Sequence, residues 1–310
     1  MDNYQTSCCR PLNLAIDVAE RGLDFTAIPK GRAFDRVLVR LVDRGGREAA
    51  TCTLSRHGNR RLPTGNVPDG DYFLQAFIST DDIGTYRGYF QDEELPVKVR
   101  RGVPSFQEPW CLQNNLGRLR DLTRSRRNVG RLLRAEAAYP CNHPEIRRLA
   151  AAITAGLDDD YGKMLAVHDW VADNIFYDVD SLRRLGGRVV ALHRSTLEVL
   201  RTRRAVCQGY SDLAVSLLRA CGIPSESVSC FALGQGTQGG WERSENRVNR
   251  INHAFTAALL RGRLVLMDIT WDSDNVYSEG RYKHLTGHGR MRKFFDVSPQ
   301  LFSAGHRLVG

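Results

Sequence analysis

The stretch that decides the fold of this chain runs from Ala205 to Leu213 and reads AVCQGYSDL. Apolar side chains then recur at helical spacing and give this segment one buried face, until Gly222 and Pro224 end it. Cys207 is therefore predicted in the first turn of a helix, where unpaired backbone N–H groups and the helix dipole favour a negative charge. Such a position lowers the pKa of a thiol and makes it a nucleophile, although most free cysteines are buried structural residues. The stretch alone leaves both interpretations open.

The length and composition indicate a globular protein of two domains. A chain of 310 residues is too long for one comfortable core. Its hydrophobic content of 42% and charged content of 25% are ordinary for such a protein. No segment approaches the run of about 20 apolar residues that crosses a bilayer, and the polar N-terminus lacks the apolar centre of a signal peptide. We therefore expect a cytoplasmic protein that makes no membrane contact, with export left open as the alternative.

The formal net charge of +9 comes mainly from arginine, since only five of the 44 basic residues are lysines. Arginine suits carboxylate and phosphate recognition, but here it is spread along the chain, whereas nucleic-acid-binding proteins usually cluster their charge. We expect a solvated basic surface and no nucleic-acid partner, and a steeply salt-dependent association with DNA or RNA would reverse this expectation. The eight cysteines form no CxxC pair, so we expect neither a zinc ribbon nor a disulfide framework.

The first third of the chain carries a β pattern. Strand candidates separated by turn signals occur at residues 37–42, 50–54, 72–78, 86–90 and 95–99. Short strands at this spacing predict an all-β, immunoglobulin-like sandwich domain over residues 1–103. Residues 104–140 are predicted to be a linker and a basic helical connection, and residues 141–310 to be a separate domain.

Helices and strands alternate within residues 141–310. A helix is predicted from Pro144, capped by Asn142 or His143, and another over residues 161–178. His168 lies on the apolar side of that second helix, so we expect a core or rim residue without a catalytic role. A capping box predicts a short helix over residues 196–202, directly before the cysteine segment.

Two strand candidates after the cysteine helix bring further polar groups together. Residues 252–260 and 263–269 are joined by an Arg-Gly turn of two residues, which predicts a hairpin of fixed register. In that register His253 and Asp268 share one face and are diagonal neighbours, about 7–8 Å apart at Cα. A carboxylate can reach an imidazole N–H from there, whereas a three-residue turn would remove the contact.

A cysteine, a histidine and an aspartate in this arrangement suit thiol-based acyl transfer. The imidazole takes the thiol proton, the carboxylate orients the imidazole, and the thiolate attacks an amide carbonyl. The alternative is that His253 is an ordinary sheet histidine and Asp268 a turn residue. Asp272 competes for the role of the carboxylate, and the hairpin register favours Asp268.

The reaction also needs hydrogen-bond donors for an oxyanion. The backbone N–H of Cys207 is one candidate, and the sequence leaves the second donor open between Gln208 and Trp241. Trp241 lies within residues 234–249, which are rich in Gly, Gln, Ser and charge. We expect these residues to form a loop beside the site that shapes substrate access.

Several of these segments together resemble the core motifs of the bacterial transglutaminase-like superfamily. They are VCQGY at 206–210, LRACGIP at 218–224, NHAF at 252–255 and DITWD at 268–272. The helix before the cysteine, and the tail FFDVS at 294–298 with Phe302 and His306 beyond it, are similar to the flanking parts of that family. The likeness covers roughly residues 140 to 307. Ile269 stands where proline is common and Phe255 where tryptophan is common, and both keep apolar bulk.

The resemblance implies an α+β, papain-like fold in which the cysteine helix packs on an antiparallel sheet. It implies Cys207 as the nucleophile, His253 as the general base and acid, and Asp268 as the orienting carboxylate. The expected reaction is acyl transfer on a peptide or carboxamide through a Cys207 thioester, with hydrolysis favoured over transglutamination. No acidic loop resembles the calcium sites of animal transglutaminases, so we expect no metal and no cofactor.

A non-catalytic protein-interaction module with the same fold is the alternative. The intact cysteine, histidine and aspartate argue against it, because a scaffold does not need all three. The expected partners are a protein or peptide substrate, together with a protein bound through the N-terminal sandwich.

Overall fold

The computed structural model describes residues 3–5, 12–29, 35–79, 86–88, 95–106, 108–125, 129–185, 188–234, 241, 250–287 and 289–309. The chain divides into two compact units, Met1–Pro109 and Trp110–Gly310.

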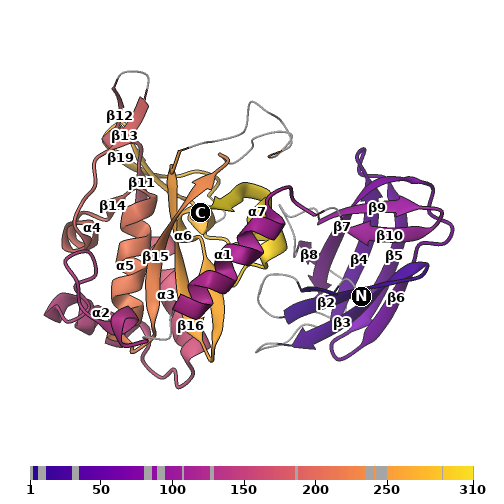
Figure 1. Cartoon of the computed structure of the whole chain (residues 1–310), viewed down its shortest axis with the longest axis horizontal. Helices are drawn as coiled ribbons and strands as arrows, with labels where there is room; N and C mark the ends of the chain where they lie inside the picture. The colour runs from indigo at the N-terminus through magenta and orange to yellow at the C-terminus, as the bar shows by residue number, and fades with distance from the viewer. Residues whose placement is uncertain are drawn as a thin grey trace. The chain divides into compact units, whose positions relative to one another are not determined.

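The first unit consists of two antiparallel sheets (Figure 1). One has the strand order β1-β2-β3-β6, with β1 (Asn3–Gln5), β2 (Leu12–Ala19), β3 (Gly22–Pro29) and β6 (Asn59–Pro63). The other has the order β10-β9-β7-β4-β5, and β8 also pairs with β7. Its strands are β4 (Arg36–Asp43), β5 (Glu48–Ser55), β7 (Gly70–Ser79), β8 (Tyr86–Gly88), β9 (Leu95–Arg100) and β10 (Val103–Phe106). Buried side chains alternate along β4 and β7, as half-buried strands require. The all-β fold predicted for this part of the chain is confirmed.

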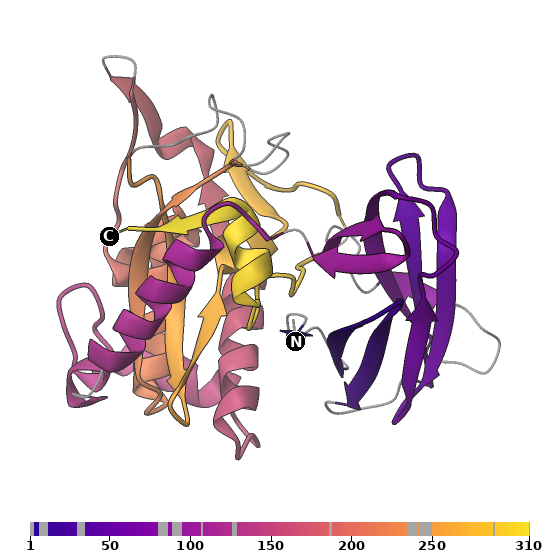
Figure 2. The same cartoon turned by 45° about the vertical axis from the view of Figure 1, so that its right-hand side comes forward.

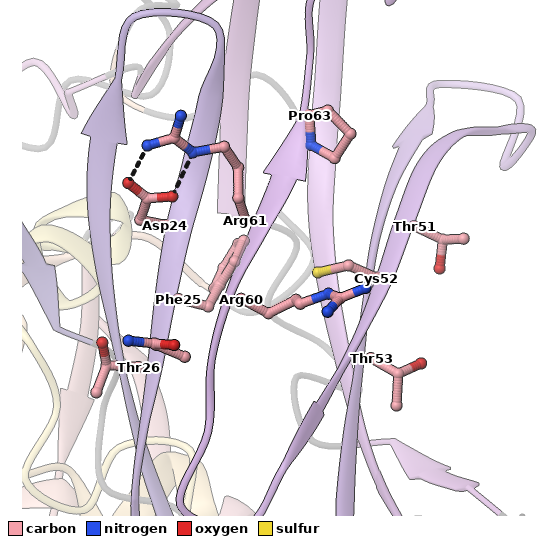
Figure 3. A pocket seen from close by; sticks show the side chains of 10 residues that line it. Asp24, Phe25, Thr26, Thr51, Cys52, Thr53, Arg60, Arg61 and Pro63 are labelled. Atoms are coloured by element: carbon pink, nitrogen blue, oxygen red, sulfur yellow. Dashed lines mark hydrogen bonds and ion pairs between the residues drawn. The ribbon is translucent and has the colours of Figure 1, made fainter.

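A hollow of about 820 Å³ opens between β3, β5 and β6 (Figure 3). Asp24 and Arg61 lie at one side of it and share two hydrogen bonds of 2.6 and 2.7 Å. Burial raises the pKa of the Cys52 thiol in its wall to about 11, against the opposing charge of Arg60. This thiol is therefore protonated near neutral pH.

The second unit is built on an antiparallel sheet of order β17-β16-β15-β20. Its strands are β15 (Ser225–Ala232), β16 (His253–Leu260), β17 (Arg263–Met267) and β20 (His306–Leu308). Helix α5 (Cys207–Ala220) lies against β15 and β16 (Figure 1), and three helices that precede it in the chain pack on it. These are α2 (Pro144–Ile153), α3 (Asp160–Asn174) and α4 (Thr196–Thr202). The cysteine helix thus packs on an antiparallel sheet, as the resemblance implied.

The opposite face of this sheet is covered by α1 (Leu112–Ser125) and α7 (Pro299–Gly305), which lie side by side (Figure 2). Ala258 and Val265 belong to the core under α5, whereas Phe255 and Leu266 pack with Leu119 and Phe302 on the other side. Alternation along the strands therefore gives the sheet two apolar faces.

A smaller sheet has the order β14-β11-β18-β19 and leads into the cysteine helix. Its strands are β14 (Arg204–Ala205), β11 (Phe176–Asp178), β18 (Asn275–Ser278) and β19 (Arg281–His284). The remaining elements are a ribbon of β12 (Leu182–Leu185) and β13 (Arg188–Ala191), the 3₁₀ turns η1 (Val129–Leu133) and η2 (Val179–Ser181), and α6 (Ile269–Asp272). The α+β fold predicted for this part of the chain is confirmed. Among the described helices, none is both long and apolar enough to cross a membrane.

The hairpin of β16 and β17 has the predicted register but ends earlier than predicted. The register runs from the pair Leu260 and Arg263 to the pair Thr256 and Met267. Both turn residues have positive φ, 49° and 84°, as a type I′ turn requires. Strand β17 ends before Asp268, because Asp268 leaves the sheet and caps α6 by accepting the N–H of Trp271. Asp268 therefore approaches His253 from a helix cap and not from a diagonal strand position.

Candidate active site

Cys207 is the first residue of α5, as predicted, and the extended residue Val206 precedes it without capping the helix through its side chain. The start of this helix packs tightly on the chain before it. A Cβ atom added to Gly209 would lie 2.8 Å from the Cβ of Ala205 and 3.1 Å from Cγ2 of Val199. Glycine at this position therefore lets the helix start sit close to α4 and β14. The side chain of Cys207 is partly exposed, as a nucleophile must be.

Most other cysteines that the structure describes lie in surroundings that keep a thiol protonated. Burial raises the pKa of Cys111 to about 11 and that of Cys230 well above its ordinary value. The same cause raises the pKa of Cys141 and Cys221. Cys207 differs in that its side chain interacts with a histidine and raises the pKa of that imidazole.

That histidine is His253, the first residue of β16, which is 8% exposed. Its Nε2 lies 2.6 Å from Oδ2 of Asp268, which leaves Nδ1 for the sulfur of Cys207. Burial acts to lower the pKa of the imidazole, but the charge and hydrogen bond of Asp268, followed by those of Cys207, outweigh it and raise the pKa to about 10. The site therefore favours an imidazolium beside the sulfur at neutral pH.

Asp268 is completely buried and remains ionised. Burial acts to raise the pKa of its carboxyl group, but the charge of His253 and hydrogen bonds from His253 and His306 lower it below the usual range. Its Oδ1 accepts the backbone N–H of Trp271 at 3.2 Å. Every contact thus favours the carboxylate form.

Asp272, the rival for the same role, binds a different histidine. Its Oδ2 lies 2.9 Å from Nε2 of His168 and also accepts the backbone N–H of Phe294 at 2.9 Å. The structure therefore brings Asp268 to His253 and places Asp272 elsewhere. His168 is fully buried, in agreement with its expected place in the core.

Both side chains considered for the second oxyanion donor already donate elsewhere. The amide nitrogen of Gln208 donates to two side chains, at 2.8 and 3.0 Å. The indole N–H of Trp241 donates to the carbonyl oxygen of Ser303 at 3.1 Å. The loop predicted over residues 234–249 lies outside the described residues, except for Gly234 and Trp241.

Tyr177 is a site residue that the sequence does not single out. It lies in β11, where it pairs with Ala205 two residues before Cys207. Burial, and then the negative charges of Cys207 and Asp268, raise the pKa of its phenol to about 12. A protonated hydroxyl group is therefore carried by a strand that pairs with the chain just before Cys207. Tyr177 is brought to the site by a parallel pairing of two very short strands, and the sequence pattern does not predict this pairing.

His306 is a second residue whose place in the site the sequence does not predict. Its Nε2 lies 2.8 Å from Oδ2 of Asp268, the oxygen that also binds His253. In the sequence it appears only in the tail of the family resemblance, far from the other site residues.

His253, Asp268 and His306 could in principle hold a metal ion, because their ligand atoms all lie within 4.8 Å of one another. The same atoms are joined by hydrogen bonds of 2.6 and 2.8 Å, and a metal ion would have to displace both N–H protons. The donor set is thus satisfied internally, and we describe it as a hydrogen-bonded cluster.

Comparison with known proteins gives a family for this unit. Residues 147–269 match the model of the transglutaminase-like superfamily. Kyphoscoliosis peptidase of Mus musculus is 27% identical over 131 residues, which cover 42% of this chain and 19% of that protein. Kyphoscoliosis peptidase of Homo sapiens is 26% identical over 215 residues, 60% of this chain and 31% of that protein. The chain thus spans less than a third of the length of these curated relatives.

Two solved structures show only a distant likeness. The periplasmic domain of TgpA from Pseudomonas aeruginosa is 13% identical with a TM-score of 0.33, and the match covers 87% of this chain and 76% of that one. Red sea bream transglutaminase is 12% identical with a TM-score of 0.32, covering 88% and 50%. The assignment rests on the sequence match over residues 147–269, which contains Cys207, His253 and Asp268. Over these residues the chain is thus similar to the transglutaminase-like superfamily.

Proposed function

We propose that this protein catalyses acyl transfer on peptide or carboxamide substrates through a thioester on Cys207. The transglutaminase-like domain supports a cysteine-dependent protease or transglutaminase-type function in general. The observation that carries the finer proposal is the 2.6 Å hydrogen bond between Nε2 of His253 and Oδ2 of Asp268, together with the interaction of that imidazole with Cys207 at the start of α5.

In the first half of the reaction the Cys207 thiolate attacks the carbonyl carbon, and a C–S bond forms. The carbonyl oxygen becomes an oxyanion, for which the backbone N–H of Cys207 at the helix start is one donor. The imidazolium of His253 then gives its proton to the departing amine as the C–N bond breaks. The product is an amine and a thioester.

In the second half His253 accepts a proton from the incoming nucleophile, which attacks the thioester. Water gives a carboxylic acid, and a primary amine gives a new amide, with the thiolate released in both cases. Asp268 keeps one imidazole orientation through both halves and stabilises the cation. Because the Cys207 side chain is partly exposed, water has access, and we favour hydrolysis.

A non-catalytic interaction module is the second candidate, supported by the separate all-β unit, which could bind a partner protein. The two candidates differ in the reactivity of one sulfur atom. Thiolate and imidazolium together are costly to bury and serve no purpose in a scaffold.

The first test measures the rate of Cys207 alkylation by iodoacetamide against pH, with peptide mass spectrometry. We expect fast labelling that persists below about pH 6, because an unperturbed thiol titrates near 8.5. The rate should collapse in His253→Ala and stay unchanged in Cys221→Ala, which removes another partly buried thiol. Labelling that rises only above about pH 8 would favour the interaction module.

The second test separates the acceptors by incubating the protein with casein and a labelled primary amine. Peptide fragments indicate hydrolysis, and label on casein indicates transfer. Cys207→Ala should abolish either product, whereas Cys221→Ala should retain it.

A further inference from the structure

One oxygen atom of the Asp268 carboxylate accepts hydrogen bonds from two histidines. Nε2 of His253 lies 2.6 Å from Oδ2, and Nε2 of His306 lies 2.8 Å from the same oxygen. All three side chains are buried, and Asp268 and His306 are completely so. His306 belongs to β20 and lies beyond the stretch that matches the family model.

The ring of His306 packs closely against two other aromatic rings. It stacks on the ring of Phe302 at 4.2 Å between centroids and an interplanar angle of 10°, and it packs on Trp271 at 4.2 Å. Its backbone N–H caps α7 by donating to the carbonyl of Phe302. A ring fixed in this way presents Nε2 in one direction.

Helix α1 fixes the backbone at the same place. The amide of Asn115 donates to the carbonyl oxygen of His306 at 2.8 Å, and its oxygen accepts the N–H of Leu308 at 2.8 Å. Asn115 is fully buried. The strand that carries His306 is therefore anchored by two directional hydrogen bonds, and not by apolar packing alone.

The ionised state of Asp268 makes Nε2 of His306 a hydrogen-bond donor. Asp268 is ionised and can only accept, so both histidine Nε2 atoms that face it carry a proton. Burial lowers the pKa of His306, and the nearby charge of His253 acts in the same direction against Asp268. His306 thus supplies an N–H group to Asp268 through Nε2, while its Nδ1 lies 3.1 Å from the carbonyl oxygen of Phe302.

We propose that His306 is a positioning residue, which holds Oδ2 of Asp268 in place so that the ring of His253 keeps Nδ1 on Cys207. This proposal rests on the proposed function for its effect on turnover. The geometry that it describes does not depend on which acyl acceptor the enzyme uses.

Loss of this donor has a defined consequence. A buried carboxylate that loses one hydrogen bond turns toward its remaining donors, and its alignment with His253 weakens. The imidazolium is then less stabilised and loses its proton at lower pH. Since His306 is completely buried and does not reach the substrate, binding should change little.

The titration of His253 reports on this arrangement, and several groups around it contribute to its charge balance. Those that face His253 or Asp268 from neighbouring elements are Cys207 of α5, Tyr177 of β11, Cys230 of β15, Asp272 of α6 and His306 of β20. Only His306 is changed in the test, so the others stay constant.

The experiment compares His306→Phe, which keeps an aromatic ring in the stack without a donor, with His306→Gln, which restores an N–H. The ¹⁵N resonances of the His253 ring are followed against pH by NMR, and kcat and KM are measured for peptide cleavage. In His306→Phe we expect the His253 titration to move about one unit to lower pH. We expect kcat to fall about 10- to 100-fold with little change in KM, and His306→Gln to recover most of both.

Phe255→Leu is the matched control, because Phe255 packs on Phe302 and near His306 without a hydrogen bond. It should lose stability and leave the His253 titration unmoved. A titration unmoved in folded His306→Phe, or moved equally by Phe255→Leu, overturns the proposal. If His306→Phe does not fold, His306→Asn, whose amide is too short to reach, is judged by the same titration. A titration that moves in a protein without any turnover upholds the positioning role and rejects the proposed function.

Discussion

At the scale of single residues, two aspartates four positions apart have different surroundings. Asp268 binds His253 and His306, whereas Asp272 binds His168 and a backbone N–H. Both are fully buried, so burial alone does not distinguish them. Their partners do, and the partners predict different effects of the same substitution.

Asp268→Asn should keep the fold and lower kcat/KM on the order of 10³- to 10⁴-fold, because an amide stabilises neither the imidazolium nor its orientation. Asp272→Asn should lower the free energy of unfolding and leave the fast alkylation of Cys207 in place. Steady-state kinetics and urea unfolding measure the two effects. An undiminished rate in Asp268→Asn would move the carboxylate role to another residue.

Tyr177 is expected to act on the oxyanion, because its phenol stays protonated, its strand pairs with Ala205 two residues before Cys207, and the two earlier candidates donate elsewhere. Tyr177→Phe should lower kcat about 100-fold, the usual effect of removing one oxyanion donor. The pH dependence of Cys207 alkylation should change far less than kcat does. Tyr282→Phe, which removes an exposed phenol from β19, is the control and should keep the wild-type kcat. Equal rates in the two variants would exclude Tyr177 as a donor.

The residues of the proposed triad could be predicted because each has a local signal. Cys207 follows from a helix start, and the two-residue turn fixes the register of the hairpin that begins at His253, whereas Asp268 reaches His253 from the cap of α6 and not from the predicted strand position. His306 and Tyr177 have no such signal. Their contacts with the site depend on α7 and on the short β11–β14 pairing, and tertiary packing decides both.

At the scale of elements, helix α6 explains why the strand predicted over residues 263–269 ends early. The sequence predicts a strand to residue 269, but α6 starts there. A helix of four residues has almost no periodicity, and this one is fixed by histidines at both ends. His253 and His306 bind Asp268 at its start, and His168 binds Asp272 at its end. These partners come from β16, β20 and α3, so no local pattern reveals them.

His168→Gln should loosen α6 and destabilise the protein. His168 is buried between Asp272 at 2.9 Å and Asp169 at 3.3 Å. Removing one partner of a buried ion pair typically lowers the free energy of unfolding by about 3–5 kcal/mol. Urea unfolding measures the difference, and His193→Gln, at an exposed position, should change nothing.

The pH dependence of that difference follows from the direction of the pKa shift. Burial acts to lower the pKa of His168, but hydrogen bonds and charges of Asp169 and Asp272 outweigh it and raise the pKa. The stabilisation is therefore fully present below the unfolded pKa of about 6.5 and is lost as the pH rises through the folded pKa. The difference in the free energy of unfolding between wild type and His168→Gln should be largest at low pH. A difference that grows from pH 6 to pH 9 would mean that His168 is buried neutral.

At the scale of the whole molecule, the question is where the catalytic unit begins. The sequence predicts residues 104–140 as a linker and helical connection, before a domain at 141–310. The structure divides the chain after Pro109 and places α1 in the second unit. The helical pattern of α1 is visible in the sequence. Its position is not, because the contacts that fix it run from Asn115 to His306 and Leu308, 191 and 193 positions away.

Two fragments test this boundary. Residues 110–310 should fold alone and keep the fast alkylation of Cys207, since they contain α1, the sheet and every proposed site residue. Residues 141–310 should be markedly less stable, because they lose Asn115 and leave the backbone of His306 and Leu308 without its buried partners, at about 1–3 kcal/mol for each unsatisfied group. Asn115→Ala in the full chain isolates this effect from the loss of the apolar face of α1. This variant should both lower the free energy of unfolding and move the His253 titration to lower pH. Equal stability and equal alkylation rates in the two fragments would show that the catalytic domain begins at residue 141 and that α1 only connects.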